Sequence, residues 1–490
     1  MINHAFKATL KKLLLLCYNF IKKKRKDLNL YILTEERPKQ EVLHTVIARF
    51  LQDKKFCAFI DTLKILPIVK ENCFTFSYEI LGVSCNGLKK IYVKIVSGAS
   101  SFVDYLVFFQ ENEPTPKDIP LYAIEETKTN DSESRNTGVY QRITKFVYLN
   151  NFYPQTTKIM LYNLKTELKK PTQTSIFGTR ILRTLGVEIM GKDFGENNEI
   201  LKPFENIEEL VAYKNSMRKP PKNNTPLNIH KIKDIIFISA RLFKANTLSH
   251  DPNIGAISGI CAALRKLGFK ENLTITHHGL EQKHLGKNNK FIQIANVLHI
   301  DLDGLTIPKA KLPQTYWHYE TQGEKLATIF IHLVVEHFSN AYGIFENHAG
   351  CEKSYFLTAD GNYIVLQKYE DKQSYKQGNK KARLFIPDLI LLDPKNLEII
   401  NIEGKKYINK QQGIKELNNY DCIETEYISK YYKNYKIIRT LVLYGSLREE
   451  IIDIEVGFLL NEKGKMILGI KAPKIFIQSL ENLLAFWKPQ

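Results

Sequence analysis

Asp388, Glu403 and Lys405 are the residues of this sequence whose types and spacing point most clearly to chemistry. Asp388 lies in the apolar run Phe385–Leu392, and the other two lie at the end of a second apolar run, Leu397–Lys405. Side chains alternate between the two faces of a strand, so residues two positions apart share a face. The sequence therefore predicts a carboxylate and an amine on one face of the second strand.

The connection between these two runs predicts how they pair. Asp393–Asn396 (DPKN) is typical of a tight turn between antiparallel strands, which would bring Asp388 beside Glu403. Two adjacent carboxylates supply hard oxygen ligands for Mg²⁺, which binds through few carboxylates, water and substrate phosphate. The metal would lower the pKa of a bound water and neutralise charge on a phosphate. Lys405 would orient that water or help to deprotonate it.

The N-terminal half contains a second set of residues with the same logic. Asp104 lies in one strand-like run (FVDYLVFF), and Glu126 and Lys128 end the next one (LYAIEETK). We expect Glu126 and Lys128 on one face of that strand and Glu125 on the other. The sequence thus predicts a second centre of metal-assisted phosphate chemistry.

A Glu-x-Lys tripeptide is weak support by itself, because this lysine-rich sequence contains five of them. The two chosen here each end an apolar strand, follow a strand that carries an aspartate, and precede a helix and another strand. The alternative for each is a solvated salt bridge at the end of a strand.

The C-terminal motif resembles the signature of the PD-(D/E)XK nuclease superfamily, and of type II restriction endonucleases in particular. It consists of Pro387-Asp388 followed by Glu403-Gly404-Lys405. The resemblance implies that Asp388 and Glu403 bind the catalytic Mg²⁺, that the carbonyl of Gly404 joins them, and that Lys405 assists the nucleophilic water.

Asp104 with Glu126-Thr127-Lys128 resembles a variant of the same signature. By that resemblance Asp104 and Glu126 bind metal and Lys128 assists catalysis. The N-terminal motif departs from the pattern, because Val103 replaces the usual proline and a loop at 110–120 lengthens the spacing.

Members of the superfamily often place one more acidic residue on the helix that opens the core. Glu336, in the amphipathic stretch Glu324–Phe338, is the matching candidate for the C-terminal centre, and a solvated helix residue is the alternative. Two such cores in one chain imply one centre for each strand of double-stranded DNA. The alternative is that one core is inactive and serves DNA binding.

Candidate DNA-contacting side chains fall into two groups. Gln141, Arg142 and Lys145 open the helix after the N-terminal motif and are candidates for phosphate or water contacts. Arg265 and Lys266 end the helix-like stretch at 257–267, which could enter a groove. The alternative for this stretch is ordinary core packing, because its apolar residues have helical spacing.

The pattern along the chain predicts an α/β protein with two restriction-endonuclease-like cores, each a mixed sheet flanked by helices, and a middle region. Each half has the order helix, strands, helix, strand. The predicted boundaries are an N-terminal helical segment at 1–60, a first core at 61–214, a linker at 215–228, a candidate DNA-recognition region at 229–320 and a second core at 321–490.

Composition limits the class of protein further. The chain has 490 residues and a formal net charge of +18, which favours a polyanionic partner, although lysine-rich composition accounts for part of that excess. Seven cysteines without a CxxC pair predict neither a zinc site nor disulfides, so we expect a cytoplasmic protein. The apolar run at 13–21 is too short to span a membrane, and we read it as an amphipathic helix.

Two absent motifs bear on the partners. The sequence has no GxxxxGK[ST] loop, so we expect no ATP. It has no recognisable methyltransferase motif, which under the resemblance implies a separate cognate DNA methyltransferase in a restriction-modification system. Two other functions stay open: a non-catalytic nucleic-acid-binding protein, and a repair or structure-specific nuclease.

Overall fold

The protein is described by a computed structural model, which covers most of the chain. The described residues are 28–71, 73–98, 101–127, 138–162, 173–191, 201–217, 227–244, 247–248, 252–286, 289–321, 323–347, 353–367, 385–445, 458–460, 463–468 and 472–487. The predicted helix at 13–21, Lys128 and most of the predicted linker lie outside these residues. The fold is mixed α/β, as predicted, with several mixed sheets flanked by helices.

The chain divides into two compact units that differ from the predicted domain boundaries. Unit 1 comprises Met1–Leu30, Glu36–Ile95 and Tyr319–Gln490, and unit 2 comprises Tyr31–Glu35 and Val96–His318. Strand β1 (Leu28–Thr34) contributes residues to both. The predicted boundaries follow chain order, whereas the units follow packing. Part of the expected first core therefore belongs to unit 1, and the expected middle region belongs to unit 2.

Unit 1 is built on an eight-stranded sheet in the order β18-β17-β16-β19-β20-β21-β22-β23. Its strands are β16 (Tyr342–Glu346), β17 (Lys353–Leu357), β18 (Tyr363–Gln367), β19 (Leu389–Asp393), β20 (Glu398–Lys406), β21 (Lys436–Tyr444), β22 (Phe458–Leu460) and β23 (Met466–Leu468). Strand β19 pairs antiparallel with β16 and β20, and β20 pairs parallel with β21. The tight turn after β19 and its antiparallel pairing with β20 are confirmed.

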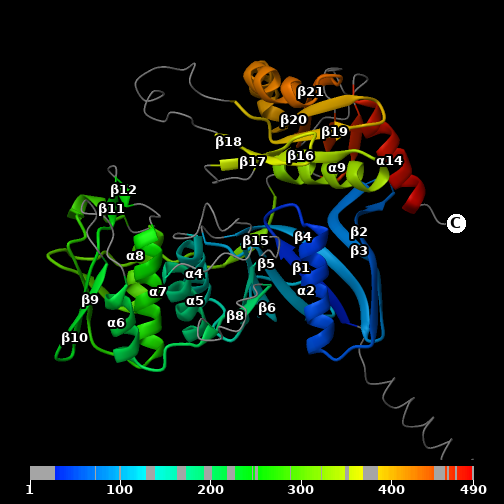
Figure 1. Ribbon diagram of the computed structural model, residues 1–490. Helices are drawn as coiled ribbons and strands as arrows, with labels where there is room; N and C mark the ends of the chain where they lie inside the picture. The colour runs from blue at the N-terminus through cyan, green and yellow to red at the C-terminus, as the bar shows by residue number, and fades with distance from the viewer. Residues whose placement is uncertain are drawn as a thin grey trace, which may run out of the picture. The chain divides into compact units, whose positions relative to one another are not determined.

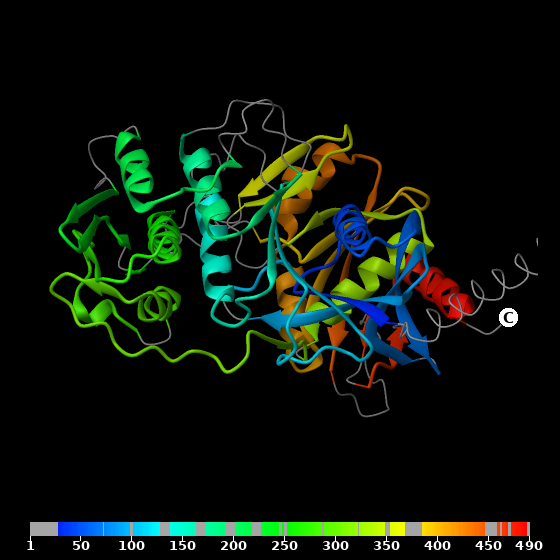
Figure 2. The same cartoon turned by 90° about the horizontal axis from the view of Figure 1, so that it is seen from below.

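Helices cover both faces of this sheet. They are α9 (Glu324–Phe338), α11 (Lys410–Leu417) with the short segments α12 (Asp421–Ile423), η5 (Glu424–Ile428) and α13 (Ser429–Tyr431), and α14 (Lys474–Trp487). In Figure 1, α9 lies below β16, β19 and β20, and the orange helices that follow β20 lie above them. Figure 2 shows the same strands from below, with the orange helices beside them.

Alternation along β20 assigns its side chains to these two helical layers. A Cβ atom on Gly404 would collide with the Thr328 hydroxyl of α9, so this position faces α9 and accepts only glycine without rearrangement. A Cβ atom on Gly413 of α11 would lie 3.0 Å from Cγ of Lys405, so Lys405 faces α11. Neighbouring residues of β20 thus face opposite helices, as strand geometry requires.

The remaining part of unit 1 is an antiparallel group of strands with one helix. Its elements are α2 (Gln40–Asp53), β2 (Ala58–Lys70), β3 (Cys73–Cys85) and β4 (Leu88–Gly98). Strand β2 pairs with β3, and β3 with β4. Strand β2 also packs on α9 and α14. This packing groups the segment with α9 and α14 in unit 1.

Unit 2 contains two parallel-strand arrangements. The first comprises β5 (Tyr105–Gln110), β6 (Tyr122–Thr127), α4 (Gly138–Leu149), β7 (Thr157–Tyr162), α5 (Gln173–Thr184), β8 (Glu188–Met190) and α6 (Ile207–Ser216). Strand β5 pairs antiparallel with β6, and β6, β7 and β8 run parallel. The chain order of helix α2, strands, helix α4 and strand β7 confirms the predicted repeat of elements in the two halves.

The second arrangement in unit 2 is a four-stranded sheet in the order β14-β13-β10-β9. Its elements are β9 (Asn228–Ile232), β10 (Ile235–Ser239), α7 (Pro252–Lys266), β13 (Leu273–Thr276), α8 (Lys290–Leu298) and β14 (Ile300–Leu302), with smaller elements at β11 (Phe243–Lys244), β12 (Thr247–Leu248), η2 (Gln282–His284) and β15 (Trp317–Tyr319). Helices α4, α5 and α7 pack side by side (Figure 1). Within the described part of the chain, none of the helices has the length and apolar character needed to cross a membrane.

Candidate active site

Asp388 and Glu403 are brought together by the pairing of β19 with β20. Leu389 pairs with Ile402, so Asp388, which directly precedes β19, lies opposite Glu403. The amide of Asp388 donates to the carbonyl of Ile402 at 3.0 Å, and the amide of Gly404 donates to Oδ2 of Asp388 at 2.9 Å. The predicted juxtaposition of the two acids is confirmed. We refer to Asp388, Glu403 and Lys405 as the C-terminal site.

Lys405 lies on the same face of β20 as Glu403, as predicted. Its Nζ atom is 2.5 Å from Oε1 of Glu403 and 2.8 Å from Oε2 of Glu416, which belongs to α11. The contacts hold the ammonium group beside the carboxylate pair. Burial opposes the charged form, but these two carboxylates raise the pKa of Lys405 above its ordinary value. Lys405 is therefore a protonated amine at neutral pH.

Two residues that contact the C-terminal site were not among the predicted ones, although the sequence carried a signal for them. Glu416 contacts Lys405, and the buried hydroxyl of Tyr420 donates to Oε2 of Glu403. They lie four positions apart in the stretch where the sequence predicts a helix after β20. Spacing of four places both on one face of a helix, so this pair could have been found by asking which face meets the strand.

Helix α9 contributes Glu324 to this site. Oε1 of Glu324 accepts a hydrogen bond from the amide of Lys406 at 2.7 Å. Burial raises the pKa of Asp388, and the charges of Glu324 and Glu416 act in the same direction. Glu324, in the first turn of α9, is thus an acid of this helix whose carboxylate contacts β20.

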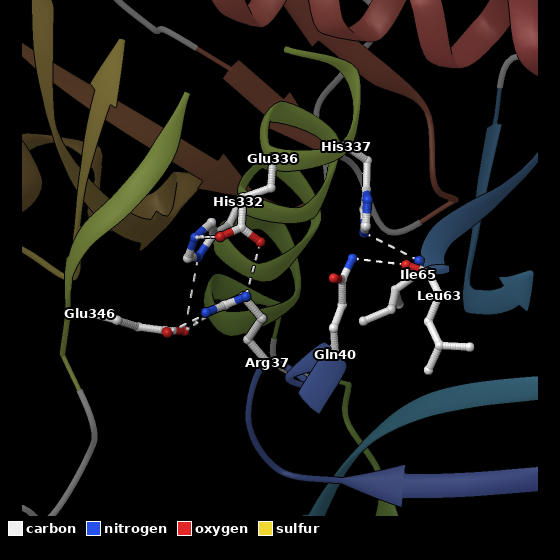
Figure 3. Close-up of polar contacts among 8 residues, drawn as sticks. All are labelled: Arg37, Gln40, Leu63, Ile65, His332, Glu336, His337 and Glu346. Atoms are coloured by element: carbon white, nitrogen blue, oxygen red, sulfur yellow. Dashed lines mark hydrogen bonds and ion pairs between the residues drawn. The ribbon is translucent and has the colours of Figure 1, made fainter. Parts of the chain in front are cut away.

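The other acid of α9, the predicted Glu336, makes its contacts with Arg37 and His332. Glu336 accepts from Nη1 of Arg37 at 3.0 Å and lies 3.2 Å from Nε2 of His332, and Arg37 also bonds Glu346 at 3.2 Å (Figure 3). Burial acts to raise the pKa of Glu336, but the hydrogen bond of His332 and the charges of His332 and Arg37 lower it to about 2. Twelve positions separate Glu336 from Glu324, or about 18 Å along the helix axis. Glu336 therefore belongs to an ion-pair cluster, not to the C-terminal site.

The charges around the C-terminal site are mostly negative. Four carboxylates surround one ammonium group, and they belong to Asp388, Glu403, Glu324 and Glu416. Burial, followed by the charge of Asp388, raises the pKa of Glu403 to about 8. The described residues contain no group of three or more His, Cys, Asp or Glu side chains arranged to hold a metal. Mg²⁺ does not require one, because it keeps several waters and binds through one or two carboxylates.

The N-terminal motif has the same backbone frame as the C-terminal site. Tyr105 pairs with Ile124, so Asp104 lies opposite Glu125. The amide of Asp104 donates to Oε2 of Glu125 at 3.3 Å, and the amide of Glu126 donates to Oδ2 of Asp104 at 2.6 Å. The second bond repeats the one from Gly404 to Asp388. Glu125 therefore corresponds to Glu403 in strand register.

The structure corrects the assignment of Glu126 and Lys128 by one position. Glu125, not Glu126, faces Asp104, and Thr127 takes the strand position of Lys405. Lys128 lies outside the described residues. A shift of one residue exchanges the two faces of a strand, and the Glu-x-Lys tripeptide alone did not fix the register.

The amine beside the N-terminal carboxylates comes from α4. Nζ of Lys145 is 2.7 Å from Oε1 of Glu125 and 3.6 Å from Oδ1 of Asp104, and it donates to Oε2 of Glu125 at 2.8 Å. Nε of Arg142 is 3.8 Å from Oε1 of Glu125 and donates to the carbonyl of Glu126. Burial and the charge of Asp104 raise the pKa of Glu125 to about 7, against both cations. We refer to Asp104, Glu125 and Lys145 as the N-terminal site.

Of the three predicted phosphate-contacting residues of α4, two are engaged with acidic groups. Arg142 and Lys145 bind the carboxylates and backbone described above, whereas Gln141 is exposed. A further lysine comes from the expected middle region. Burial and the charge of Lys145 lower the pKa of Lys290, the first residue of α8, to about 8, although Glu125 opposes them. No sequence spacing connects Lys290 with α4, so the pattern gave no signal for it.

Helix α7 is not available for insertion into a DNA groove. Residues 254–264 are all buried, which confirms the alternative of core packing. Arg265 donates to the carbonyls of Leu298 at 2.8 Å and His299 at 2.9 Å, and to two more carbonyls, of Phe269 and Glu271, in the connection that follows its own helix. The guanidinium group thus joins α7 to the end of α8. Only Lys266 of the predicted pair is exposed.

The comparisons with known proteins add no family to this picture. No family model, curated protein or solved structure matches this chain. The geometry of the two sites and the charge of the chain are therefore the observations that bear on its function.

Proposed function

We propose that this protein is a Mg²⁺-dependent endonuclease of the PD-(D/E)XK type that hydrolyses phosphodiester bonds in double-stranded DNA. The observation that carries the proposal is the C-terminal site, where strand pairing sets Asp388 against Glu403 and places Lys405 on the same face as Glu403. The arrangement of α9, β16, β19, β20, α11 and β21 around it is consistent with the restriction-endonuclease-like core that the motif resembles.

The donor set fits a hard divalent cation. Asp388 uses Oδ2 for the amide of Gly404, and Oδ1 is the oxygen available to a ligand. Glu403 supplies a second carboxylate, and Gly404, whose carbonyl is the further proposed ligand, directly follows Glu403 in sequence. Four carboxylates outnumber one ammonium group here, and their net negative charge attracts a divalent cation. When bound, Mg²⁺ would supply Lewis-acid stabilisation of phosphate charge and a more acidic water.

The protein's own residues hold and polarise this arrangement. The Tyr420 hydroxyl and the Lys405 ammonium bind different oxygens of Glu403 and so fix its carboxylate plane. Lys405 is protonated, so it acts as a hydrogen-bond donor that orients the attacking water or the phosphate oxygen. Gly404 allows the close approach of α9, which brings Glu324 toward Asp388.

Double-stranded DNA is the proposed substrate because of the charge of the whole chain. A formal net charge of +18 favours binding to a polyanion with a strong dependence on salt. By resemblance to type II restriction enzymes we further propose sequence-specific cleavage, in a restriction-modification system whose DNA methyltransferase is a separate protein. The expected compartment is the cytoplasm.

The test is digestion of supercoiled plasmid and unmethylated phage DNA with Mg²⁺ by the wild type, Lys405→Ala and Lys283→Ala. Lys283 belongs to a Glu-x-Lys tripeptide whose salt bridge with Glu281 is exposed, so its variant is a matched control. We expect discrete fragments from the wild type and Lys283→Ala, none after chelation of Mg²⁺, and a loss of about 100-fold or more in rate for Lys405→Ala.

Other outcomes distinguish the remaining functions. Salt-dependent DNA binding without any product would indicate a non-catalytic binding protein. Cleavage restricted to single strands or branched junctions, with no discrete fragments from duplex DNA, would indicate a repair or structure-specific nuclease. Cleavage by Lys405→Ala at the wild-type rate would refute the C-terminal site as the active centre.

A further inference from the structure

The two sites share a backbone frame but differ in their charged side chains. In both, an aspartate directly precedes one strand, a glutamate lies opposite it, and the next backbone amide donates to the aspartate. These contacts place two carboxylates side by side in each unit. Any difference in ligand binding must therefore come from the residues added around each pair.

The C-terminal pair is surrounded by further acids. Glu324 and Glu416 join Asp388 and Glu403, and among the described residues Lys405 is the cation that contacts this group. The Lys405 ammonium bonds Glu403 and Glu416, not Asp388, so it does not bridge the carboxylate pair. The formal charge of these five groups is about −3 with all four acids ionised, and about −2 below the pKa of Glu403, which is about 8.

The N-terminal pair is surrounded by cations instead. Lys145 and Arg142 act directly on Glu125, and Lys290 acts on both Lys145 and Glu125. Counted over the residues that the structure describes, these three cations give the group around Asp104 and Glu125 a formal charge of about +1. If the adjacent Glu126 is counted as well, the sum is about zero. A divalent cation gains no net attraction from such a set.

The position of the Lys145 ammonium is the decisive difference. Nζ of Lys145 contacts both oxygens of Glu125 and lies 3.6 Å from Oδ1 of Asp104. A cation that bridges the two carboxylates would need this same place. The ammonium group already neutralises the pair there, and the nearby Arg142 excludes a second positive charge by repulsion.

We propose that the N-terminal site takes no divalent cation, because the Lys145 ammonium stands where the cation would bridge Asp104 and Glu125. This inference rests on the proposed function, in which Mg²⁺ serves the C-terminal site. It means that each chain carries one metal-dependent centre and cuts one strand of a duplex at a time. Cleavage of the second strand then requires a second binding event or a second chain.

The test counts Mn²⁺ ions bound per chain, by electron paramagnetic resonance of the free ion during titration of the full-length protein. We expect about one ion for the wild type and Asp104→Asn and about none for Asp388→Asn at the same concentration. Lys145→Gln removes the ammonium and keeps an uncharged side chain of similar length. With Glu126 counted, it changes the formal charge of the group from about zero to about −1 and frees the place between the two carboxylates, so the variant should bind about one ion more than the wild type, whereas Lys145→Arg should not.

The outcomes separate this inference from the proposed function. A folded Lys145→Gln protein with no additional Mn²⁺ would overturn the inference, as would two ions in the wild type with one lost in Asp104→Asn. Should Lys145→Gln fail to fold, as circular dichroism would show, the Asp104→Asn comparison still decides. Because binding is counted without DNA, an absence of nuclease activity would refute the proposed function while leaving the ion count intact.

Discussion

Replacement of Glu403 by glutamine should make the metal-free protein more stable at alkaline pH. Burial and the charge of Asp388 raise the pKa of Glu403 from 4.5 to about 8 in the folded protein. Below pH 4.5 the Glu403 carboxyl is protonated in both the folded and the unfolded protein, so its contribution to the free energy of unfolding is fully present. Between pH 4.5 and 8 only the unfolded state ionises, and the wild type loses stability as the pH rises through that window.

The size of the effect follows from the same shift. Each tenfold change in acidity corresponds to about 1.4 kcal/mol, so a rise from 4.5 to about 8 gives an upper limit of roughly 5 kcal/mol. Glutamine imitates the protonated acid and still accepts the Tyr420 hydroxyl, so the variant should lack this pH dependence. The difference between the two proteins should open above pH 4.5 and level off above pH 8.

Urea unfolding of the wild type and Glu403→Gln at pH 4.5, 6, 7 and 9, without metal, measures this difference directly. Comparison of the two proteins at each pH cancels the titration of all other groups. Glu281→Gln is the matched control, because the hydrogen bond of Lys283 lowers the pKa of the exposed Glu281, so its contribution is already present at pH 6 and should not change between pH 6 and 9. Equal loss of stability by wild type and Glu403→Gln between pH 4.5 and 9 would refute the reasoning. Added Mg²⁺ should stabilise the wild type above pH 8 but not the variant.

Two further substitutions test the surroundings of the C-terminal site. Gly404→Ala should lower the free energy of unfolding in urea by about 1–3 kcal/mol, because its Cβ would collide with the Thr328 hydroxyl. Thr328→Ala should recover part of that loss in the double variant. Full stability of Gly404→Ala would contradict the close approach of α9. Arg37→Met should lower the free energy of unfolding by about 1–3 kcal/mol, because it leaves the partly buried Glu336 and Glu346 without their shared cation. DNA cleavage at 25 °C should stay unchanged. A loss of cleavage without a loss of stability would instead indicate that Glu336 belongs to the active site.

The C-terminal site was predictable because its three residues lie within one short segment. A tight turn joins β19 to β20, so the register of the pair follows from the sequence between Asp388 and Glu403. Strand alternation then places Lys405 on the same face as Glu403. Local rules were sufficient here, and they also predicted α9 and β21 with the bounds that the structure has.

The N-terminal site was predictable only in part. Asp104 and the following acidic strand were found, but the long connection at 110–120 does not fix the strand register as a tight turn does. The sequence therefore left two neighbouring glutamates to choose between, and the tripeptide match favoured the wrong one. Lys290 approaches this site through the packing of α8 on α7 and of α7 on α4, which no local pattern encodes.

The choice of acid on α9 has a different physical reason. Helical periodicity predicts which residues share a face, but it does not say which turn of the helix meets the end of the strand. Glu324 and Glu336 both satisfy the requirement for an acid on the opening helix, and only the approach of the first turn of α9 to Gly404 distinguishes them. A glycine in the middle of a Glu-x-Lys motif marks this approach, because it removes the side chain that would separate helix and strand.

The glycine at position 404 also explains how the two sites come to differ. With Gly404 at the central position, α9 approaches β20 closely and adds the carboxylate of Glu324 to the pair, so the negative charge accumulates. The N-terminal site has Glu126 at the equivalent position and obtains its nearest charges from α4, as the cations Lys145 and Arg142. Strand register alone creates two carboxylate pairs of the same geometry. Which pair binds a divalent cation is then decided by the helix that packs beside it.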